Sequence, residues 1–145
     1  MTRIRRTLAV LATALTMAGR AAADDTYTRQ VDAQLGLVTV ALAVDNWTLD
    51  QTAMGSLYQG ETGWAWVRLV KGRSYKIVGA CDEGCYDLDL SLYRDSGERI
   101  TTDRQYDDLP TLTLRAPYSG YYKVKAPMAG CAFGPCEYGI AVFIR

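Results

Sequence analysis

From residue 56 onward, apolar and polar side chains alternate with a period of two in one short run after another. In residues 87–92, for example, three leucines alternate with two aspartates and a serine. This period is typical of strands that bury one face, and turn residues such as those at 95–97 separate the runs. The pattern predicts a mainly β fold, namely an antiparallel β-sandwich in which each sheet has one face exposed to solvent. The expected strands cover residues 64–69, 75–79, 87–92, 99–102, 111–115, 121–126 and 138–144.

The segment before these runs has a helical pattern instead. Residues 26–45 contain no proline and one glycine, and four of their apolar residues recur at helical spacing. We expect one amino-terminal helix over about residues 28–44, although the β-branched run at 38–40 leaves a strand open for part of it. Residues 47–55 are expected to form a connecting loop. The apolar stripe consists of Val31, Leu35, Val38 and Leu42.

The last expected strand, residues 138–144, is apolar on both faces apart from Gly139. A strand of this kind is typical of the middle of a sheet that is covered on both sides. The amino-terminal helix is the obvious second cover, so we expect it to lie over one outer face of the sandwich or at one end.

The first 23 residues have the pattern of a secretory signal. Three arginines lie within residues 1–6, an apolar run follows over 8–18, and three alanines precede Asp24. The apolar run is shorter than the roughly 20 residues that a permanent membrane helix needs. We therefore expect cleavage after Ala23, a periplasmic or secreted protein, and no membrane span in the product. The expected parts are a signal at 1–23, a helix and connecting loop at 24–55, and a β-sandwich at 56–145.

Charge and composition narrow the function classes. Residues 1–23 hold four of the sixteen basic residues and no acidic one, so the remaining chain has a formal charge of −4. An acidic domain is unsuited to binding nucleic acid, which needs a basic surface. The chain contains no histidine, which removes the commonest general base and excludes Ser-His-Asp and Cys-His catalysis within it.

The four cysteines form two close pairs, Cys81 with Cys85 and Cys131 with Cys136. In an exported chain an even number of cysteines favours disulfides, and we favour the two local pairings. Each would close a loop of five or six residues, which contributes only ~2 kcal/mol by loop entropy. The alternative is one four-cysteine zinc site, whose usual spacing is shorter than the spacing found here.

Residues 72–143 contain four short motifs: Gly72-x-x-Tyr75-x-Ile77, Asp87-Leu88-Asp89-Leu90-Ser91-Leu92-Tyr93 with Gly97, Ser119-Gly120-Tyr121-Tyr122-x-Val124 and Tyr138-Gly139-x-Ala141-Val142. These motifs resemble those of the bacterial pre-peptidase carboxy-terminal (PPC) domain. The resemblance covers about half of the chain and extends to small exported proteobacterial proteins that have no assigned activity. It implies a jelly-roll-like β-sandwich that serves as an accessory or binding module, and some members bind calcium. The chain departs from the family in its amino-terminal helix, its cysteine pairs and its lack of a protease domain.

Two groups of acidic residues are candidates for a calcium site, because calcium takes six to eight hard oxygen ligands. Asp82, Asp87 and Asp89 lie beside the first cysteine pair, and Asp103 belongs to the second group. The favoured interpretation is simpler, namely that these aspartates face solvent or cap backbone amides, since no Asp-x-Asp-x-Asp-Gly loop is present. Carboxylate-based glycoside hydrolysis is the least favoured reading, because nothing marks a sugar-binding cleft between two carboxyls.

Trp64 and Trp66 should share the strand face opposite the core, next to Arg68. Exposed, they would form a stacking platform for sugars or for a protein partner. The favoured interpretation is that the helix covers them, because its apolar stripe must be buried somewhere. Tyr121, Lys123 and Lys125 should likewise share an outward face, with Tyr122 turned inward. Together these observations predict an exported, non-enzymatic binding or accessory module of unknown ligand, with a calcium-binding structural domain as the alternative.

Overall fold

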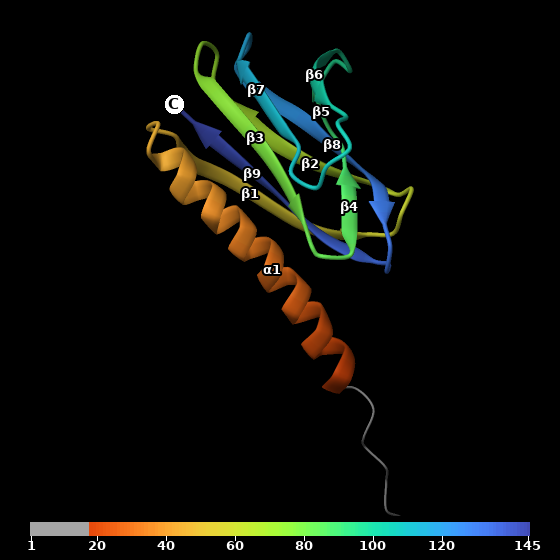
Figure 1. The fold of residues 1–145 in the computed structure, drawn as a ribbon. Helices are drawn as coiled ribbons and strands as arrows, with labels where there is room; N and C mark the ends of the chain where they lie inside the picture. Colours follow the sequence, from red (N-terminus) through yellow and green to blue (C-terminus); the bar gives the residue numbers. More distant parts are fainter. Residues whose placement is uncertain (1–17) are drawn as a thin grey trace, which may run out of the picture.

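The computed structural model describes residues 18–145, with side chains from residue 26 onward, as one helix and nine strands in two antiparallel sheets (Figure 1). Sheet A has the order β1-β9-β3-β7, and sheet B has the order β2-β8-β5-β6 with β4 also paired to β8. The mainly β sandwich with one amino-terminal helix is therefore confirmed. The elements are α1 (Ala18–Ala43), β1 (Thr48–Leu57), β2 (Thr62–Leu69), β3 (Ser74–Cys81), β4 (Cys85–Leu88), β5 (Leu90–Arg94), β6 (Arg99–Asp103), β7 (Thr111–Arg115), β8 (Gly120–Cys131) and β9 (Cys136–Ile144).

The main core lies between the two sheets and is built from the inward positions of the alternating strands. Tyr122 and Val124 of β8 face it from sheet B, while Tyr75 and Ile77 of β3 face it from sheet A, and all four are at most 1% exposed. Burying side chains of this size provides most of the free energy that holds such a sandwich together. The inward direction predicted for Tyr122 is confirmed.

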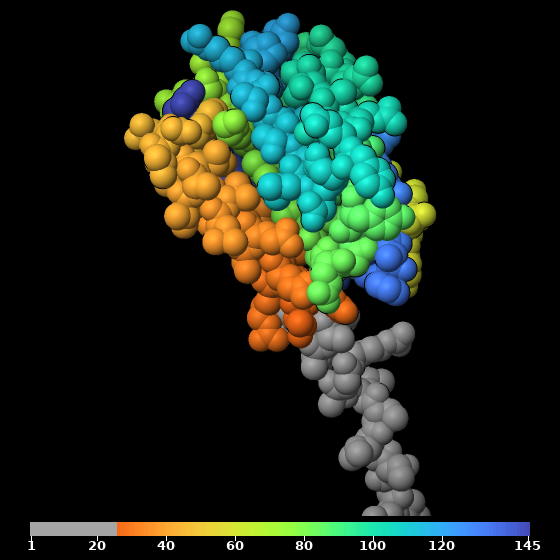
Figure 2. All heavy atoms as spheres, in the orientation of Figure 1, coloured from red at the N-terminus to blue at the C-terminus, as the bar shows by residue number. Residues whose placement is uncertain are grey.

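The helix covers the outer face of sheet A, along β9 and β3, and forms one side of the molecule (Figures 1 and 2). Its stripe packs there: Val31 and Leu35 are 0% and 7% exposed, and Trp47 completes the cluster at 5%. Gly139 of β9 permits the close approach, because a Cβ at this position would lie 2.8 Å from Leu35 Cδ1 and 2.9 Å from Val31 Cγ1. The predicted central, doubly covered β9 and its helical cover are thus both confirmed.

Three expectations about element boundaries are wrong. Residues 47–55 are not a connecting loop, since most of them belong to β1, which pairs with β9 from Thr48 to Leu57. The helix begins at Ala18 rather than near residue 28. The run at 87–92 is divided between β4 and β5, which pair with different parts of β8. For β1 and for the division between β4 and β5, pairing with a distant segment decides the structure, which local propensity does not report.

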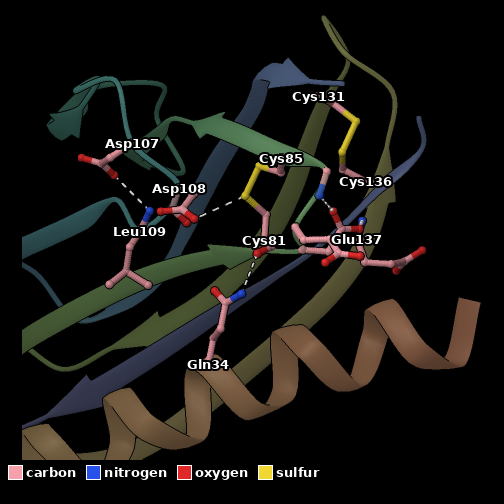
Figure 3. The surroundings of a disulfide bond; sticks show 12 residues. Gln34, Cys81, Cys85, Asp107, Asp108, Leu109, Cys131, Cys136 and Glu137 are labelled. Carbon is pink, nitrogen blue, oxygen red and sulfur yellow. Dashed lines mark hydrogen bonds between the residues drawn. A yellow bond between two sulfur atoms is a disulfide. The ribbon is translucent and has the colours of Figure 1, made fainter. Parts of the chain in front are cut away.

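Both predicted local disulfides are formed, Cys81–Cys85 and Cys131–Cys136. Each one bridges a short crossing between the sheets: the first joins the end of β3 to the start of β4, and the second joins the end of β8 to the start of β9. Figure 3 shows the two disulfides near one another, with the side chain of Gln34 in the helix directed at Cys81. The side-chain amide of Gln34 donates a 3.0 Å hydrogen bond to the carbonyl oxygen of Cys81.

The predicted secretory signal, residues 1–23, lies mostly outside the described residues and stays a prediction. Among the described residues, no helix has both the length and the apolar character that crossing a membrane requires.

Candidate functional site

Within the described part of the chain, no helix or strand covers the outer face of sheet B, which carries a patterned set of side chains from β2 and β8. Strand register places Trp64 opposite Lys125, Trp66 opposite Lys123, and Arg68 opposite Tyr121. Because side chains alternate along a strand, all six project from the same face. We call these six residues the aromatic–basic face.

The two tryptophans are exposed, so the favoured prediction that the helix covers them is wrong. Trp64 is 56% exposed and Trp66 is 55% exposed. The helix lies over sheet A, while β2 is an edge strand of sheet B (Figure 1). The alternative prediction, that both indoles share an outward face with Arg68, describes the observed arrangement. The common outward face predicted for Tyr121, Lys123 and Lys125 is also confirmed.

Cations and aromatic rings contact one another across the two strands of this face. The ammonium of Lys123 lies 4.7 Å from the centre of the Trp66 ring, and that of Lys125 lies 5.7 Å from the Trp64 ring. Tyr121 meets Trp66 edge to face, with 6.5 Å between ring centres. These contacts hold both ammonium groups against the sheet surface, and such a cation–π contact at an exposed site contributes about 0.5–1 kcal/mol. The face is therefore positively charged and partly ordered before any ligand arrives.

A depression of about 290 Å³ continues the aromatic–basic face towards β5 and β6. Lys125 belongs to both, because it pairs with Trp64 on one side and with Ser91 on the other. We call this depression the cation pocket, since three cations line it. Its lining includes Asp89, Ser91, Tyr93, Arg99, Arg104 and Lys125.

Among the described residues, Asp89 is the one carboxylate in the lining of the cation pocket, and Arg104 balances its charge. Asp89 Oδ2 lies 3.7 Å from Arg104 Nε. Burial, followed by repulsion from Asp87 and Asp103, raises the pKa of Asp89, while Arg104 lowers it and does not fully compensate. Neither Arg99 nor Lys125 has an ion-pair partner within the described part of the chain. The pocket thus retains two cations that no carboxylate neutralises.

The four aspartates predicted as calcium ligands do not form one site. Asp82 is 3% exposed, and its two carboxylate oxygens accept hydrogen bonds from the amides of Gly84, at 2.9 Å, and Glu137, at 2.6 Å. Asp103 accepts hydrogen bonds from the amides of Gln105 and Thr111. Both carboxylates therefore cap backbone amides.

Asp87 and Asp89 lie close enough to Asp103 and Asp107 for electrostatic interaction. Burial and then repulsion from Asp107 raise the pKa of Asp87, and its Oδ1 is buried without a hydrogen-bond partner. No three aspartate, glutamate or cysteine side chains among residues 26–145 are grouped so that they could hold a metal ion. Calcium binding stays a prediction.

The end of the sandwich that carries the disulfides has a different character. Phe133, in the loop closed by Cys131–Cys136, is 82% exposed. Beside this loop is a hollow of about 450 Å³, lined by acidic residues that include Glu83 and Glu137. This end combines exposed aromatic surface with negative charge, the opposite of the charge on the aromatic–basic face.

Sequence reasoning missed four residues of the candidate site: Ser91, Tyr93, Arg99 and Arg104. A signal existed for Tyr93, because it continues the alternation in which Leu90 and Leu92 face the core. No local signal existed for the arginines, since they reach the pocket only through the placement of β6 next to β5.

Comparison with known proteins supports the fold. No protein-family model matches the chain, and no curated protein does. Among solved structures, it is similar to the pre-peptidase C-terminal domain of a collagenase from Bacillus anthracis, with a TM-score of 0.50 and 17% identity over 65% of this chain and 89% of that one. It is also similar to PliG of Aeromonas hydrophila, a periplasmic inhibitor of g-type lysozyme, with a TM-score of 0.50 and 14% identity over 66% of this chain and 85% of that one. The resemblance to PPC domains is thereby confirmed as a likeness of fold.

Proposed function

We propose that the chain is a non-enzymatic binding module that acts outside the cytoplasm and holds a glycan on its aromatic–basic face. The observation that carries the proposal is the exposure of Trp64 and Trp66, each more than half accessible, on one face of an edge strand. Burying large aromatic side chains against a ligand is favourable, and tryptophan is enriched in binding hot spots.

The shape and composition of the face favour a glycan over a protein partner. Trp64 and Trp66 occupy alternate positions of β2, so their backbones lie about 7 Å apart along the strand, and the facing positions of β8 are lysines. This produces separate aromatic rings among polar groups, whereas a protein interface needs a contiguous apolar centre with a polar rim.

Two further observations support a binding role outside the cytoplasm. The paired cysteines are typical of oxidising compartments, and both pairs are bonded. Two of the structures with a similar fold are a domain of a collagenase and a periplasmic inhibitor protein. The chain contains no histidine, which leaves it without the most common general base.

A glycan array tests the proposal, with the oxidised protein as the probe. We expect retention on a subset of polysaccharides, and its loss in the W64A/W66A variant. Phe133→Ala is the matched control, because it removes an exposed aromatic ring from the disulfide end and should bind normally. Binding that survives W64A/W66A, or no binding to any glycan, would overturn the proposal.

A protein partner is the second candidate, and the exposed Phe133 favours it. A ring that is 82% exposed on a loop braced by a disulfide is suited to insertion into a partner's pocket. Because PliG inhibits g-type lysozyme, hydrolysis of peptidoglycan by a g-type lysozyme is the first assay. Inhibition that is lost in Phe133→Ala and kept in W64A/W66A would establish this role in place of the first.

A calcium-binding structural role is favoured by one observation, the unpartnered, buried Oδ1 of Asp87. Calcium should then raise Tm, because an ion that binds only the folded state stabilises it. The effect should be absent in Asp87→Asn. An unchanged Tm in millimolar calcium would exclude this role.

A further inference from the structure

We propose that the ligand of the aromatic–basic face is an acidic polysaccharide, whose sugar rings pack on Trp64 and Trp66 and whose carboxylate or sulfate groups enter the cation pocket. This inference rests on the proposed function and adds the charge of the ligand.

The charge of the pocket is the first observation. Arg99, Arg104 and Lys125 line it, and the single facing carboxylate, Asp89, is already paired with Arg104. Arg99 and Lys125 are left without a carboxylate partner in the described residues. On a chain whose residues 24–145 carry a formal charge of −4, two uncompensated cations in one depression form a local site for an anion. Guanidinium groups bind carboxylate and sulfate oxygens through short, charge-assisted hydrogen bonds.

The continuity between the rings and the pocket is the second observation. Lys125 stands between them, opposite Trp64 on β2 and opposite Ser91 on β5. Directly opposed residues of an antiparallel pair have Cβ atoms about 4.5–5.5 Å apart. A sugar ring on Trp64 therefore places a substituent within reach of the Lys125 ammonium, which the indole already holds near the surface. One ligand can use both parts of the site.

A second aromatic–cation row makes the site longer than one sugar. Register places Trp66, Lys123, Tyr93 and Arg99 in line across β2, β8, β5 and β6. The row next to it contains Trp64, Lys125 and Ser91. Each row pairs an aromatic ring with a cation, and this repeat matches a polymer in which every unit has a sugar ring and a negatively charged group.

Among anionic polymers, a polysaccharide fits better than a single-stranded nucleic acid. Nucleic acid binding needs a basic groove that follows the phosphates over several nucleotides. Here the basic residues form a short patch, and the acidic residues Asp87 and Asp103 lie near Asp89 of the pocket lining. A nucleic acid carries its charge in the backbone itself and would meet these carboxylates, whereas a polysaccharide carries its charge on substituents that can be directed into the pocket.

Matched polymers test the inference directly. Polygalacturonate is compared with its methyl ester, and dextran sulfate with dextran, so that the members of each pair share a sugar backbone and only one of them carries anionic groups. We expect the charged member to bind about tenfold or more tightly than the neutral one, since hydrogen bonds to charged groups are the stronger ones. The preference should decrease at high salt because exposed charges are screened.

The variant R99Q/K125Q removes the two uncompensated cations and leaves the Arg104–Asp89 pair intact. It should lose about tenfold or more in affinity for the charged polymers and keep the weak affinity for the neutral ones. The variant K71Q/R73Q is the control, because it makes the same change of charge in the exposed turn between β2 and β3.

The outcomes separate the two proposals. Glycan binding that W64A/W66A abolishes and R99Q/K125Q leaves unchanged would overturn the acidic ligand and leave the proposed function standing. Equal binding of charged and neutral polymers would do the same. An oligothymidylate that binds more tightly than both charged polysaccharides would overturn the choice of polymer. Loss of thermal stability in R99Q/K125Q is checked by its Tm, which should match that of the control.

Discussion

The outer faces of the two sheets differ although the strands behind them are built alike. On sheet A, Val78 of β3 and Ala141 and Phe143 of β9 face outward, and the cluster formed with the helix buries them. On sheet B the outward residues are aromatic and basic, and nothing among the described residues covers them. The first face contributes to stability and the second leaves large aromatic side chains exposed to solvent.

This difference shows how an exposed tryptophan should be interpreted. Trp47 and Trp66 both lie on outer faces, yet Trp47 is 5% exposed and Trp66 is 55% exposed. Trp47 lies in the helix–sheet A cluster, so its burial contributes to folding. The exposure of Trp66 does not help folding. Aromatic residues that are exposed together in a patterned group are typical of binding surfaces.

The largest expected effect comes from truncating the helix–sheet A interface. Leu35→Ala should reduce the free energy of unfolding by about 2–4 kcal/mol, because it leaves a cavity between the helix and β9. Urea denaturation measures the change. Leu37→Ala, on the same helix but 73% exposed, is the control and should change stability by less than about 0.5 kcal/mol. Trp66→Ala on sheet B should also have a small effect, and a loss comparable to that of Leu35→Ala would break the comparison.

The next largest effect is expected from the disulfides that clamp the crossings between the sheets. Replacing Cys131 and Cys136 together by alanine should cost about 2 kcal/mol, the loop-closure value for so short a loop. Replacing Cys81 and Cys85 should cost a similar amount. Thermal denaturation measures both, with the reduced wild-type protein as the reference. If either pair costs nothing, its sheet-to-sheet crossing is held by packing alone.

The fluorescence of the three tryptophans compares the solvent exposure of the two faces directly. In W47F, the remaining emission comes from Trp64 and Trp66 and should be red-shifted and readily quenched by acrylamide. In W64F/W66F, Trp47 alone emits and should be blue-shifted, with quenching reduced several-fold. Similar quenching constants for the two variants would mean that both faces are covered or both are open, and would contradict the comparison.

The same comparison shows what sequence could and could not predict. Alternation predicted most strands, and the two-sided apolar pattern of residues 138–144 predicted which strand the helix covers. The exposure of Trp64 was not predictable from local pattern, because it depends on β2 lying in the sheet without β9. β1 was missed for a related reason: its sequence contains Asp50, Gln51 and Gly55, poor strand formers that are kept extended by pairing with β9.

The site was predicted only in part, for the same physical reason. Residues two apart on one strand share a face whatever the topology is, so Trp64, Trp66 and Arg68 could be grouped in advance. The cation pocket requires three strands in a given order, and Arg99 enters it from β6. The role of Asp82 depends on the Glu137 amide, 55 residues away.

The smallest expected effect concerns the acidic residues beside sheet B. Burial and then Asp107 raise the pKa of Asp87 in the folded protein, so folding favours its protonated form. Its contribution therefore destabilises the protein as pH rises through and above the ordinary aspartate range, and disappears below it. In EDTA, Asp87→Asn should raise Tm by about 1–3 °C at pH 7, because the buried, unpartnered oxygen no longer carries charge.

At pH 3 the wild-type carboxyl is itself mostly protonated, so the two Tm values should converge. Glu83→Gln is the control, since it removes one exposed carboxylate on the turn before β4 and should change Tm little at either pH. A lower Tm for Asp87→Asn at pH 7 would mean that the charge of Asp87 stabilises the fold. The acidic residues beside the cation pocket would then stabilise the fold by attracting its cations. The outer face of sheet B would thus contribute to stability, as the outer face of sheet A does.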